Sequence, residues 1–178
     1  QFRKGDCKTA FEQAAWSVSG QVDTQAQEHL YFETQTALAI PHDGTRLKIF
    51  FASQNPSSIQ KFAARILGIP MNAIEVEVPR LGGAFGGKEE QAKTWALLAA
   101  LGAFVTQQPV KLTLTRQEDM HWTGKRHPYS ARYRLAADRD GKLLAYEVQF
   151  LQDGGAVADL STAILERTLF HATNAYAI

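Results

Sequence analysis

The side chains best suited to chemistry lie in one glycine-rich stretch, residues 82–89 (GGAFGGKE). Its four glycines leave one aromatic ring, one cation and one carboxylate on a nearly bare backbone. A strand-like run precedes this stretch and a helix-like run follows it. Glycine at such a junction allows backbone amides to come close to a ligand. The function of the chain therefore depends on which ligand this stretch binds.

A phosphate-binding loop is the first interpretation. Gly82, Gly87 and Lys88 match the G-x-x-x-x-G-K part of that pattern, in which the next position is Ser or Thr. Here that position is Glu89, which lacks the hydroxyl that binds magnesium and would repel phosphates. The dinucleotide pattern G-x-G-x-x-G is also absent from residues 82–89. Hydrolysis of a nucleoside triphosphate is therefore disfavoured.

A purely structural loop is the second interpretation. The glycines would form a tight corner and Phe85 would enter the core. Glu89 and Glu90 would complement the dipole of the following helix, contributing roughly 0.3–1 kcal/mol each. The residues of the loop alone leave this interpretation open.

Composition narrows the class of protein. The chain has 178 residues, is 45% hydrophobic and 21% charged, and carries a net charge of +1. No global charge attracts it to nucleic acid or anionic lipid, and no apolar run reaches the roughly 18 residues that a membrane span needs. We therefore expect neither partner.

The single cysteine, Cys7, excludes an internal disulfide and fits the cytoplasmic location that we expect. The sequence shows no signal-peptide pattern. Because it begins at Gln1 rather than Met and ends at Ile178 without a polar tail, we expect a piece of a longer polypeptide.

Hydrophobic periodicity predicts alternating strands and helices, with the first helix best defined. Asn55 suits its N-cap, Pro56 its first position and Gly68 a left-handed stop. Residues 1–27 are expected to be mostly irregular. The other predicted elements are strands at 30–40, 47–51, 73–78 and 110–115, a helix at 90–105, a hairpin of 129–136 with 142–150, and a helix at 160–171.

This order places two loops of interest after strands. If the strands before Gln54 and Gly82 are parallel neighbours, both loops leave the same edge of the sheet. Gln54 and Glu89 would then face one cleft, because ligands in such arrangements lie beyond the carboxyl ends of strands.

Two further expectations concern helices and polar surface. Asp119 is expected to be solvated. A stripe along the second helix is formed by Trp95, Leu98, Leu101 and Val105.

Several long motifs, in order, carry a family resemblance. They are QEHLYFET (27–34), SQNP (53–56), LGIPMNAIEVEVPRLGGAFGGKE (67–89) and TRQEDMHWTGKRHPYSARYRL (115–135), with KGD (4–6) and LERTLFHATNAY (165–176) at the two ends. Together they resemble the N-terminal part of the molybdopterin-binding region in the large subunit or domain of xanthine dehydrogenases. The resemblance implies an α+β fold with mixed sheets and helices, the first molybdenum-cofactor-binding domain of this type. We expect residues 1–178 to form one partial domain.

The resemblance also implies roles for individual residues. Gln54 would hydrogen-bond an oxo ligand of molybdenum, and Phe85 and Gly86 would lie against the metal centre without ligating it. Glu89 would bind the purine and help to stabilise its transition state, and Arg167 would be the substrate arginine. The physical chemistry agrees, because a carboxamide donates without adding charge and a fixed guanidinium stabilises developing negative charge. Glu89 and Arg167 together favour a purine over a simple aldehyde.

The activity implied is that of an oxidoreductase that hydroxylates purines such as hypoxanthine and xanthine with a water-derived oxygen. The implied cofactor is molybdenum–molybdopterin, with FAD and [2Fe-2S] clusters on other domains or subunits of an oligomer. The catalytic base and most pterin-binding segments are expected beyond Ile178, so the isolated chain should be inactive. Two alternatives stay open: a non-catalytic module for subunit contact, and a disfavoured phosphate-binding enzyme.

Overall fold

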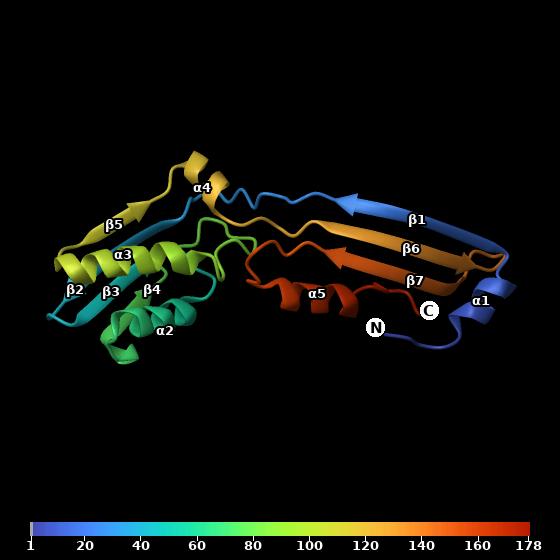
Figure 1. Ribbon diagram of the computed structural model, residues 1–178, viewed down its shortest axis with the longest axis horizontal. Helices are drawn as coiled ribbons and strands as arrows, with labels where there is room; N and C mark the ends of the chain where they lie inside the picture. The colour runs from blue at the N-terminus through green and yellow to red at the C-terminus, as the bar shows by residue number, and fades with distance from the viewer. Residues whose placement is uncertain (1) are drawn as a thin grey trace. The chain divides into compact units, whose positions relative to one another are not determined.

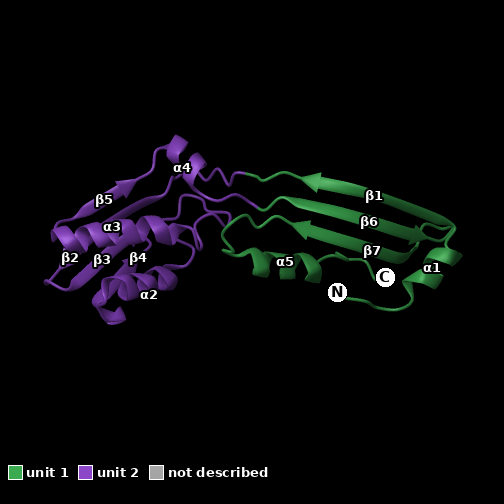
Figure 2. Ribbon diagram, in the orientation of Figure 1, with its two compact units in different colours: residues 1–27, 127–178 green, residues 28–126 purple. Residues whose placement is uncertain are grey.

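A computed structural model describes residues 2–178 and divides them into two compact units (Figure 2). One unit combines the described residues up to Gln27 with His127–Ile178, and the other is Glu28–Arg126. Each unit has its own sheet with helices packed against it (Figure 1). The α+β fold is thus confirmed, while a single domain over residues 1–178 stays a prediction.

The Glu28–Arg126 unit is built on a mixed sheet with the strand order β4-β3-β2-β5. Its central strands form the predicted antiparallel hairpin, and β3 pairs with β4 in parallel. The strands are β2 (Thr36–His42), β3 (Arg46–Phe51), β4 (Ile74–Glu77) and β5 (Val110–Thr113). The helices are α2 (Pro56–Leu67), the 3-10 turn η1 (Met71–Ala73), α3 (Ala92–Thr106) and α4 (Arg116–Trp122).

The first helix of this unit confirms its sequence signals. The side chain of Asn55 accepts a hydrogen bond from the Ser58 N–H at 3.2 Å, and Pro56 occupies the first turn. Gly68 ends α2 in the left-handed conformation, with φ of 67°. The helix buries Ile59 and Ala63 against the sheet, in the same core as α3.

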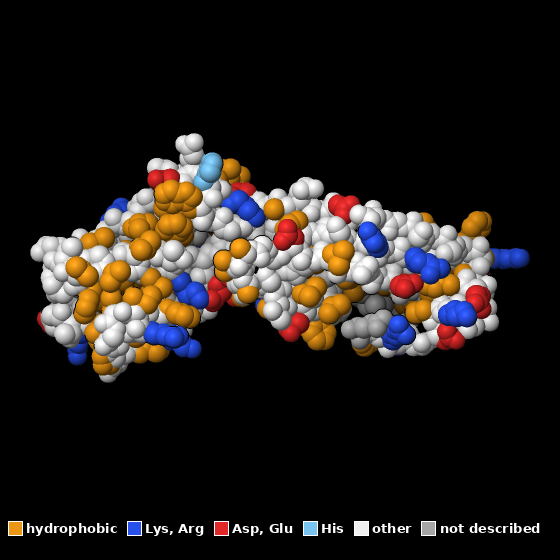
Figure 3. Space-filling view, viewed as in Figure 1, with side chains coloured by type: hydrophobic (Ala, Val, Ile, Leu, Met, Phe, Trp, Pro, Cys, Tyr) orange, Lys and Arg blue, Asp and Glu red, His pale blue; other side chains and the backbone are white. Residues whose placement is uncertain are grey.

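The buried face of α3 differs from the predicted stripe. It consists of small side chains, Ala92, Ala96, Ala99, Ala100 and Ala103. Leu98, Leu101 and Val105 are exposed instead, and hydrophobic side chains gather over α2 and α3 in Figure 3. Alanines allow the helix axis to lie close to the sheet, so the larger apolar residues take the outer face.

The other unit is a three-stranded antiparallel sheet in the order β1-β6-β7. It comprises α1 (Cys7–Gln13), β1 (Trp16–Thr24), β6 (Tyr129–Ala137), β7 (Leu143–Gln152) and α5 (Ser161–Phe170). The hairpin of β6 with β7 and the last helix are confirmed. The prediction of an irregular start is wrong, because residues 16–24 pair with β6 along their whole length. Gly20 stands where the alternation of apolar and polar residues requires an apolar side chain. The sequence pattern therefore did not indicate a strand. Across residues 2–178, no helix is long and apolar enough to span a membrane.

Candidate functional site

The predicted meeting of two loops at one sheet edge is confirmed. Since β3 and β4 are parallel, with Phe50 opposite Glu77, the segments that follow them leave the sheet on the same side. The first segment carries Gln54 and the second is the glycine loop, residues 82–89. They are joined directly, since the backbone N–H of Gln54 donates to the carbonyl oxygen of Lys88 at 2.8 Å.

The side chain of Gln54 is oriented by the glycine loop. Its Oε1 accepts hydrogen bonds from the backbone N–H groups of Gly86 at 3.1 Å and Lys88 at 3.3 Å. Only an oxygen can accept from these donors, so the amide group is fixed with Nε2 on the other side. Within residues 2–178 that Nε2 has no hydrogen-bond partner. Gln54 therefore presents a neutral, oriented donor on an exposed surface.

Phe85 and Gly86 form a left-handed turn at the tip of the loop. Their φ angles are 54° and 93°. For a bulky residue such as Phe85 this conformation costs on the order of 1–3 kcal/mol, a strain found at binding and catalytic sites. The ring is 71% exposed, so the interpretation in which Phe85 enters the core is wrong. The turn leaves the aromatic side chain exposed, one residue before the Gly86 N–H that bonds Gln54.

The base of the loop packs tightly on the segment before β2. A Cβ added at Gly87 would lie 2.7 Å from Cε1 of Tyr31 and 2.9 Å from Cγ of His29, closer than side-chain atoms approach. At the start of the loop, Gly82 exchanges two hydrogen bonds with Glu33. Its N–H donates to Glu33 Oε2 at 2.9 Å, and its carbonyl accepts from the Glu33 N–H at 2.9 Å. Glycine is required where the two segments touch.

Lys88 points into the unit rather than toward a ligand. Its side chain has 0% exposure, its Nζ lies 3.3 Å from Glu33 Oε2, and it sits 4.7 Å from the centre of the Tyr31 ring. Burial lowers the pKa of Lys88, and the carboxylate of Glu33 opposes that shift. Because the ammonium is enclosed and paired, it cannot contact a phosphate at the loop surface. The structure thus agrees with the rejection of the phosphate loop.

Asp119 is buried, with 1% of its surface exposed. The prediction that this residue is solvated is therefore wrong. Its carboxylate accepts hydrogen bonds from the Tyr31 hydroxyl and the Gln35 N–H, each at 2.7 Å. Helix α4 positions it through a capping box between Thr115 and Glu118. The T-x-x-E pattern of residues 115–118 marks the start of this helix in the sequence, but no sequence signal indicated that Asp119 is buried.

Gln35 connects this buried carboxylate to the loop. Its Nε2 donates to the Tyr31 hydroxyl oxygen at 2.9 Å and to the Gly87 carbonyl at 3.0 Å. Tyr31, with Asp119 and Gln35 bonded to its hydroxyl, forms a rigid floor under the glycine loop. Burial raises the pKa of Tyr31 first, and the hydrogen bond from its hydroxyl to Asp119 raises it further, so the hydroxyl stays protonated.

The two predicted substrate residues lie in different units. Glu89 ends the glycine loop, is half-buried, and makes no hydrogen bond or ion pair with any residue in the described chain. Its carboxylate is therefore free to bind a ligand. Arg167 lies exposed in the last turn of α5, in the unit that contains His127–Ile178. The structure brings Gln54 against Gly86, in the loop that also carries Phe85 and Glu89, whereas the roles of these residues and a shared pocket with Arg167 stay predictions.

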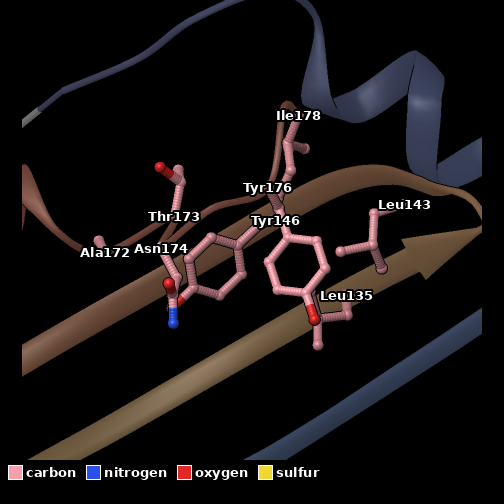
Figure 4. A pocket seen from close by; sticks show the side chains of 8 residues that line it. All are labelled: Leu135, Leu143, Tyr146, Ala172, Thr173, Asn174, Tyr176 and Ile178. Carbon is pink, nitrogen blue, oxygen red and sulfur yellow. The ribbon is translucent and has the colours of Figure 1, made fainter.

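A separate cavity of about 350 Å³ lies in the unit that contains His127–Ile178. Its lining is apolar and aromatic, with Leu135, Leu143, Tyr146 and Tyr176 among its side chains (Figure 4). None of the predicted site residues lines it, and its lining contains no charged side chain. We therefore locate the candidate site at the glycine loop.

The whole chain is similar to known proteins. The model of the molybdopterin cofactor-binding domain family matches residues 1–178. Xanthine dehydrogenase/oxidase from Rattus norvegicus is 42% identical over 179 residues, covering 100% of this chain and 13% of that protein. Xanthine dehydrogenase from Dictyostelium discoideum is 35% identical, covering 99% of this chain and 13% of that protein. The chain thus spans about 13% of the length of these curated relatives.

Solved structures with the same fold include two bacterial oxidoreductases. Aldehyde oxidoreductase from Desulfovibrio gigas superposes with a TM-score of 0.81 at 27% identity, over 92% of this chain and 18% of that one. Quinoline 2-oxidoreductase from Pseudomonas putida 86 gives a TM-score of 0.77 at 32% identity, over 85% of this chain and 19% of that one. These similarities cover both units of the chain.

Proposed function

The chain belongs to the molybdopterin cofactor-binding domain family, and from this membership we propose that it forms part of the active site of a purine-oxidising molybdenum hydroxylase. Its relatives named xanthine dehydrogenase match nearly all of its length. Since the chain spans 13% of their length, the rest of the site would come from other parts of the protein.

The observation that carries this proposal is the orientation of Gln54. Two loop N–H groups fix its Oε1, so the free Nε2 can donate a hydrogen bond to an oxygen ligand of the metal without adding charge. Molybdenum–molybdopterin, when bound, supplies the oxidation itself and a water-derived oxygen for the substrate carbon. Gln54 would help to hold the cofactor and polarise its oxygen ligand.

The glycine loop also fits a bulky anionic group at its surface. A Cβ added at Gly86 would come no closer than 3.9 Å to its nearest neighbour, His29 Nε2. This is an ordinary contact distance, so no close neighbour crowds that side of the backbone and a cofactor could approach it there. The exposed ring of Phe85 would cover one side of the metal centre and exclude water from it.

Glu89 and Arg167 would select and activate the substrate. The unpaired carboxylate of Glu89 can accept a hydrogen bond from the N–H edge of a purine such as hypoxanthine or xanthine. The guanidinium of Arg167 would stabilise the negative charge that develops on the ring during attack. Both groups are available, since neither forms an ion pair within residues 2–178.

The remaining components belong to the rest of the protein. We propose that a further molybdenum-domain segment supplies the catalytic base, and that flavin and [2Fe-2S] domains or subunits carry the electrons away. We place the assembled oligomer in the cytoplasm and expect the isolated chain to be inactive.

Oxygen labelling tests this function. Full-length protein should convert xanthine to a hydroxylated product in isotopically labelled water, with the label in the product. Label incorporated from dioxygen instead, or no product with any purine, would overturn the proposal. Turnover of an aldehyde without turnover of purines would retain the hydroxylase class and reject the substrate.

A further inference from the structure

We propose that Lys88 is a positioning residue of the molybdenum site: its buried side chain holds the glycine loop in the conformation that orients Gln54. This inference rests on the proposed role of Gln54 beside the metal. Lys88 lies too deep to touch substrate or cofactor itself, because its side chain has 0% exposure.

The backbone of Lys88 contacts the Gln54 segment at three points. Its N–H donates to Gln54 Oε1 at 3.3 Å, and its carbonyl accepts from the Gln54 N–H at 2.8 Å. The same carbonyl accepts from the Ser53 hydroxyl at 3.3 Å. A shift of the Lys88 backbone would therefore move both the main chain and the carboxamide of Gln54.

The side chain of Lys88 ties the end of the loop to its beginning. Glu33 Oε2 accepts from Lys88 Nζ at 3.3 Å and from the Gly82 N–H at 2.9 Å. One carboxylate oxygen thus binds both ends of the glycine loop. Between these ends lies the strained turn at Phe85, which is stable only if its surroundings hold it.

The surroundings of the ammonium are themselves fixed. Lys88 Nζ lies 4.7 Å from the centre of the Tyr31 ring, a favourable distance for a cation–π contact. The hydroxyl of Tyr31 is held by Asp119 and Gln35. The lysine therefore binds to a rigid floor rather than to a mobile side chain.

Stability alone does not explain a buried charge at this position. Removing an ammonium from water is costly, and an apolar side chain of similar volume often serves a core equally well or better. Lys93 on α3 provides a comparison within the same unit, because it also pairs with a carboxylate, that of Glu90, and its Nζ lies 4.2 Å from the centre of the Phe62 ring. Its side chain bonds no atom of residues 82–89, which makes Lys93→Met a matched control.

Hydrogen exchange provides a test that does not depend on activity. In full-length protein, Lys88→Met keeps the stem of the side chain and removes the ammonium. We expect the backbone N–H groups of Gly86 and residue 88 to exchange with solvent about tenfold faster than in the parent protein. A tenfold change corresponds to the net free energy that one hydrogen bond contributes to stability. Lys93→Met should leave their exchange unchanged. Unchanged exchange in Lys88→Met would overturn the proposal.

The kinetic signature separates positioning from simple destabilisation. In the loaded enzyme, Lys88→Met should keep its molybdenum and its KM for xanthine while kcat falls about 10²-fold, as expected for a misplaced group. Its molybdenum(V) electron paramagnetic resonance spectrum should change, whereas that of Lys93→Met should match the parent. A kcat and spectrum equal to those of the parent would overturn the assignment.

A double variant covers the case in which Lys88→Met folds poorly. Adding Glu33→Gln removes the carboxylate that Lys88→Met leaves without its cation, and should restore Tm, because no charge at this position then lacks its partner. Positioning by Lys88 predicts that kcat and exchange stay impaired at the restored Tm. Full recovery of both would show a purely structural role. If the parent protein holds no molybdenum, the proposed function fails, and the exchange experiment still decides whether Lys88 orders the loop.

Discussion

The backbone N–H of Gly86 donates to the side-chain oxygen of Gln54 at 3.1 Å. These residues come from two different loops, yet the bond makes them parts of one surface. It leaves the amide nitrogen of Gln54 free and fixes which way it faces. The chemical character of the site follows from this contact, because it converts an exposed glutamine into an oriented donor.

Replacing that donor should impair catalysis while preserving the loop. Gln54→Glu keeps an oxygen that accepts from Gly86 but supplies no N–H toward the metal. We expect kcat for xanthine to fall about 10²-fold, in the range found when one preorganised donor is removed. Steady-state kinetics on the full-length enzyme measures this. The control Gln149→Glu, exposed on β7, should behave like the parent; equal rates in both variants would remove Gln54 from the site.

Glu89 and Arg167 should act together on the purine. In the full-length enzyme, Glu89→Gln and Arg167→Met should each lower kcat/KM for xanthine by the equivalent of about 1–3 kcal/mol, because a polar partner of the substrate is lost. Turnover of a simple aldehyde should change less. Glu166→Gln, the exposed neighbour of Arg167, serves as the control and should change neither rate.

The double variant shows whether the two residues share a pocket. Coupled residues give a combined loss that differs from the sum of the single losses by about 0.5 kcal/mol or more. We expect such coupling for Glu89→Gln with Arg167→Met. Strict additivity would separate Arg167 from the purine site.

Asp119 should contribute to stability through its buried hydrogen bonds. Asp119→Ala leaves the Tyr31 hydroxyl and the Gln35 N–H without their acceptor, at a cost of roughly 1–3 kcal/mol for each unsatisfied group. Thermal denaturation should show a clearly lower Tm. The exposed turn residue Asp140 provides the comparison, since Asp140→Ala should leave Tm nearly unchanged. Equal Tm values for the two variants would contradict the buried network.

His29 should make the protein less stable in mild acid. Burial lowers the pKa of His29, and the cations Lys125 and Arg126 lower it further, against the opposing charges of Glu28 and Asp119. Unfolded histidine gains a proton near pH 6.5, whereas folded His29 stays neutral to a lower pH. The unfolded state therefore binds more protons in this window, and stability falls as pH falls through it.

Thermal denaturation across pH checks this sign. His29→Gln should show a smaller loss of Tm than the parent as the pH falls from about 7.5 to 5, where histidine titrates. His42→Gln removes an exposed histidine and should keep the full slope of the parent. A parent-like slope in His29→Gln would show that other groups cause the acid sensitivity.

The sequence predicted those parts of the fold that depend on local chemistry. Asn55, Pro56 and Gly68 mark the ends of α2 through their own backbone preferences, and each takes the predicted position. The parallel pairing of β3 with β4 followed from the order of elements, and it correctly placed Gln54 beside the glycine loop.

Features that depend on distant partners could not be predicted in this way. β1 is stabilised by pairing with β6, which lies more than 100 residues away in the chain. Asp119 lies in a polar stretch of sequence, and its burial depends on Tyr31 and the backbone of Gln35, more than 80 residues earlier in the chain. Lys88 fits a phosphate pattern in sequence, and only its ion pair with Glu33 shows that it faces inward.

The most direct test of the central claim is metal analysis of the intact, full-length protein purified from its source. A molybdenum site built in part by Gln54 and residues 82–89 predicts molybdenum in stoichiometric amount. It also predicts a molybdenum(V) spectrum that shifts in Gln54→Glu. Active, folded protein without molybdenum, or a molybdenum spectrum that does not respond to that substitution, would contradict the account.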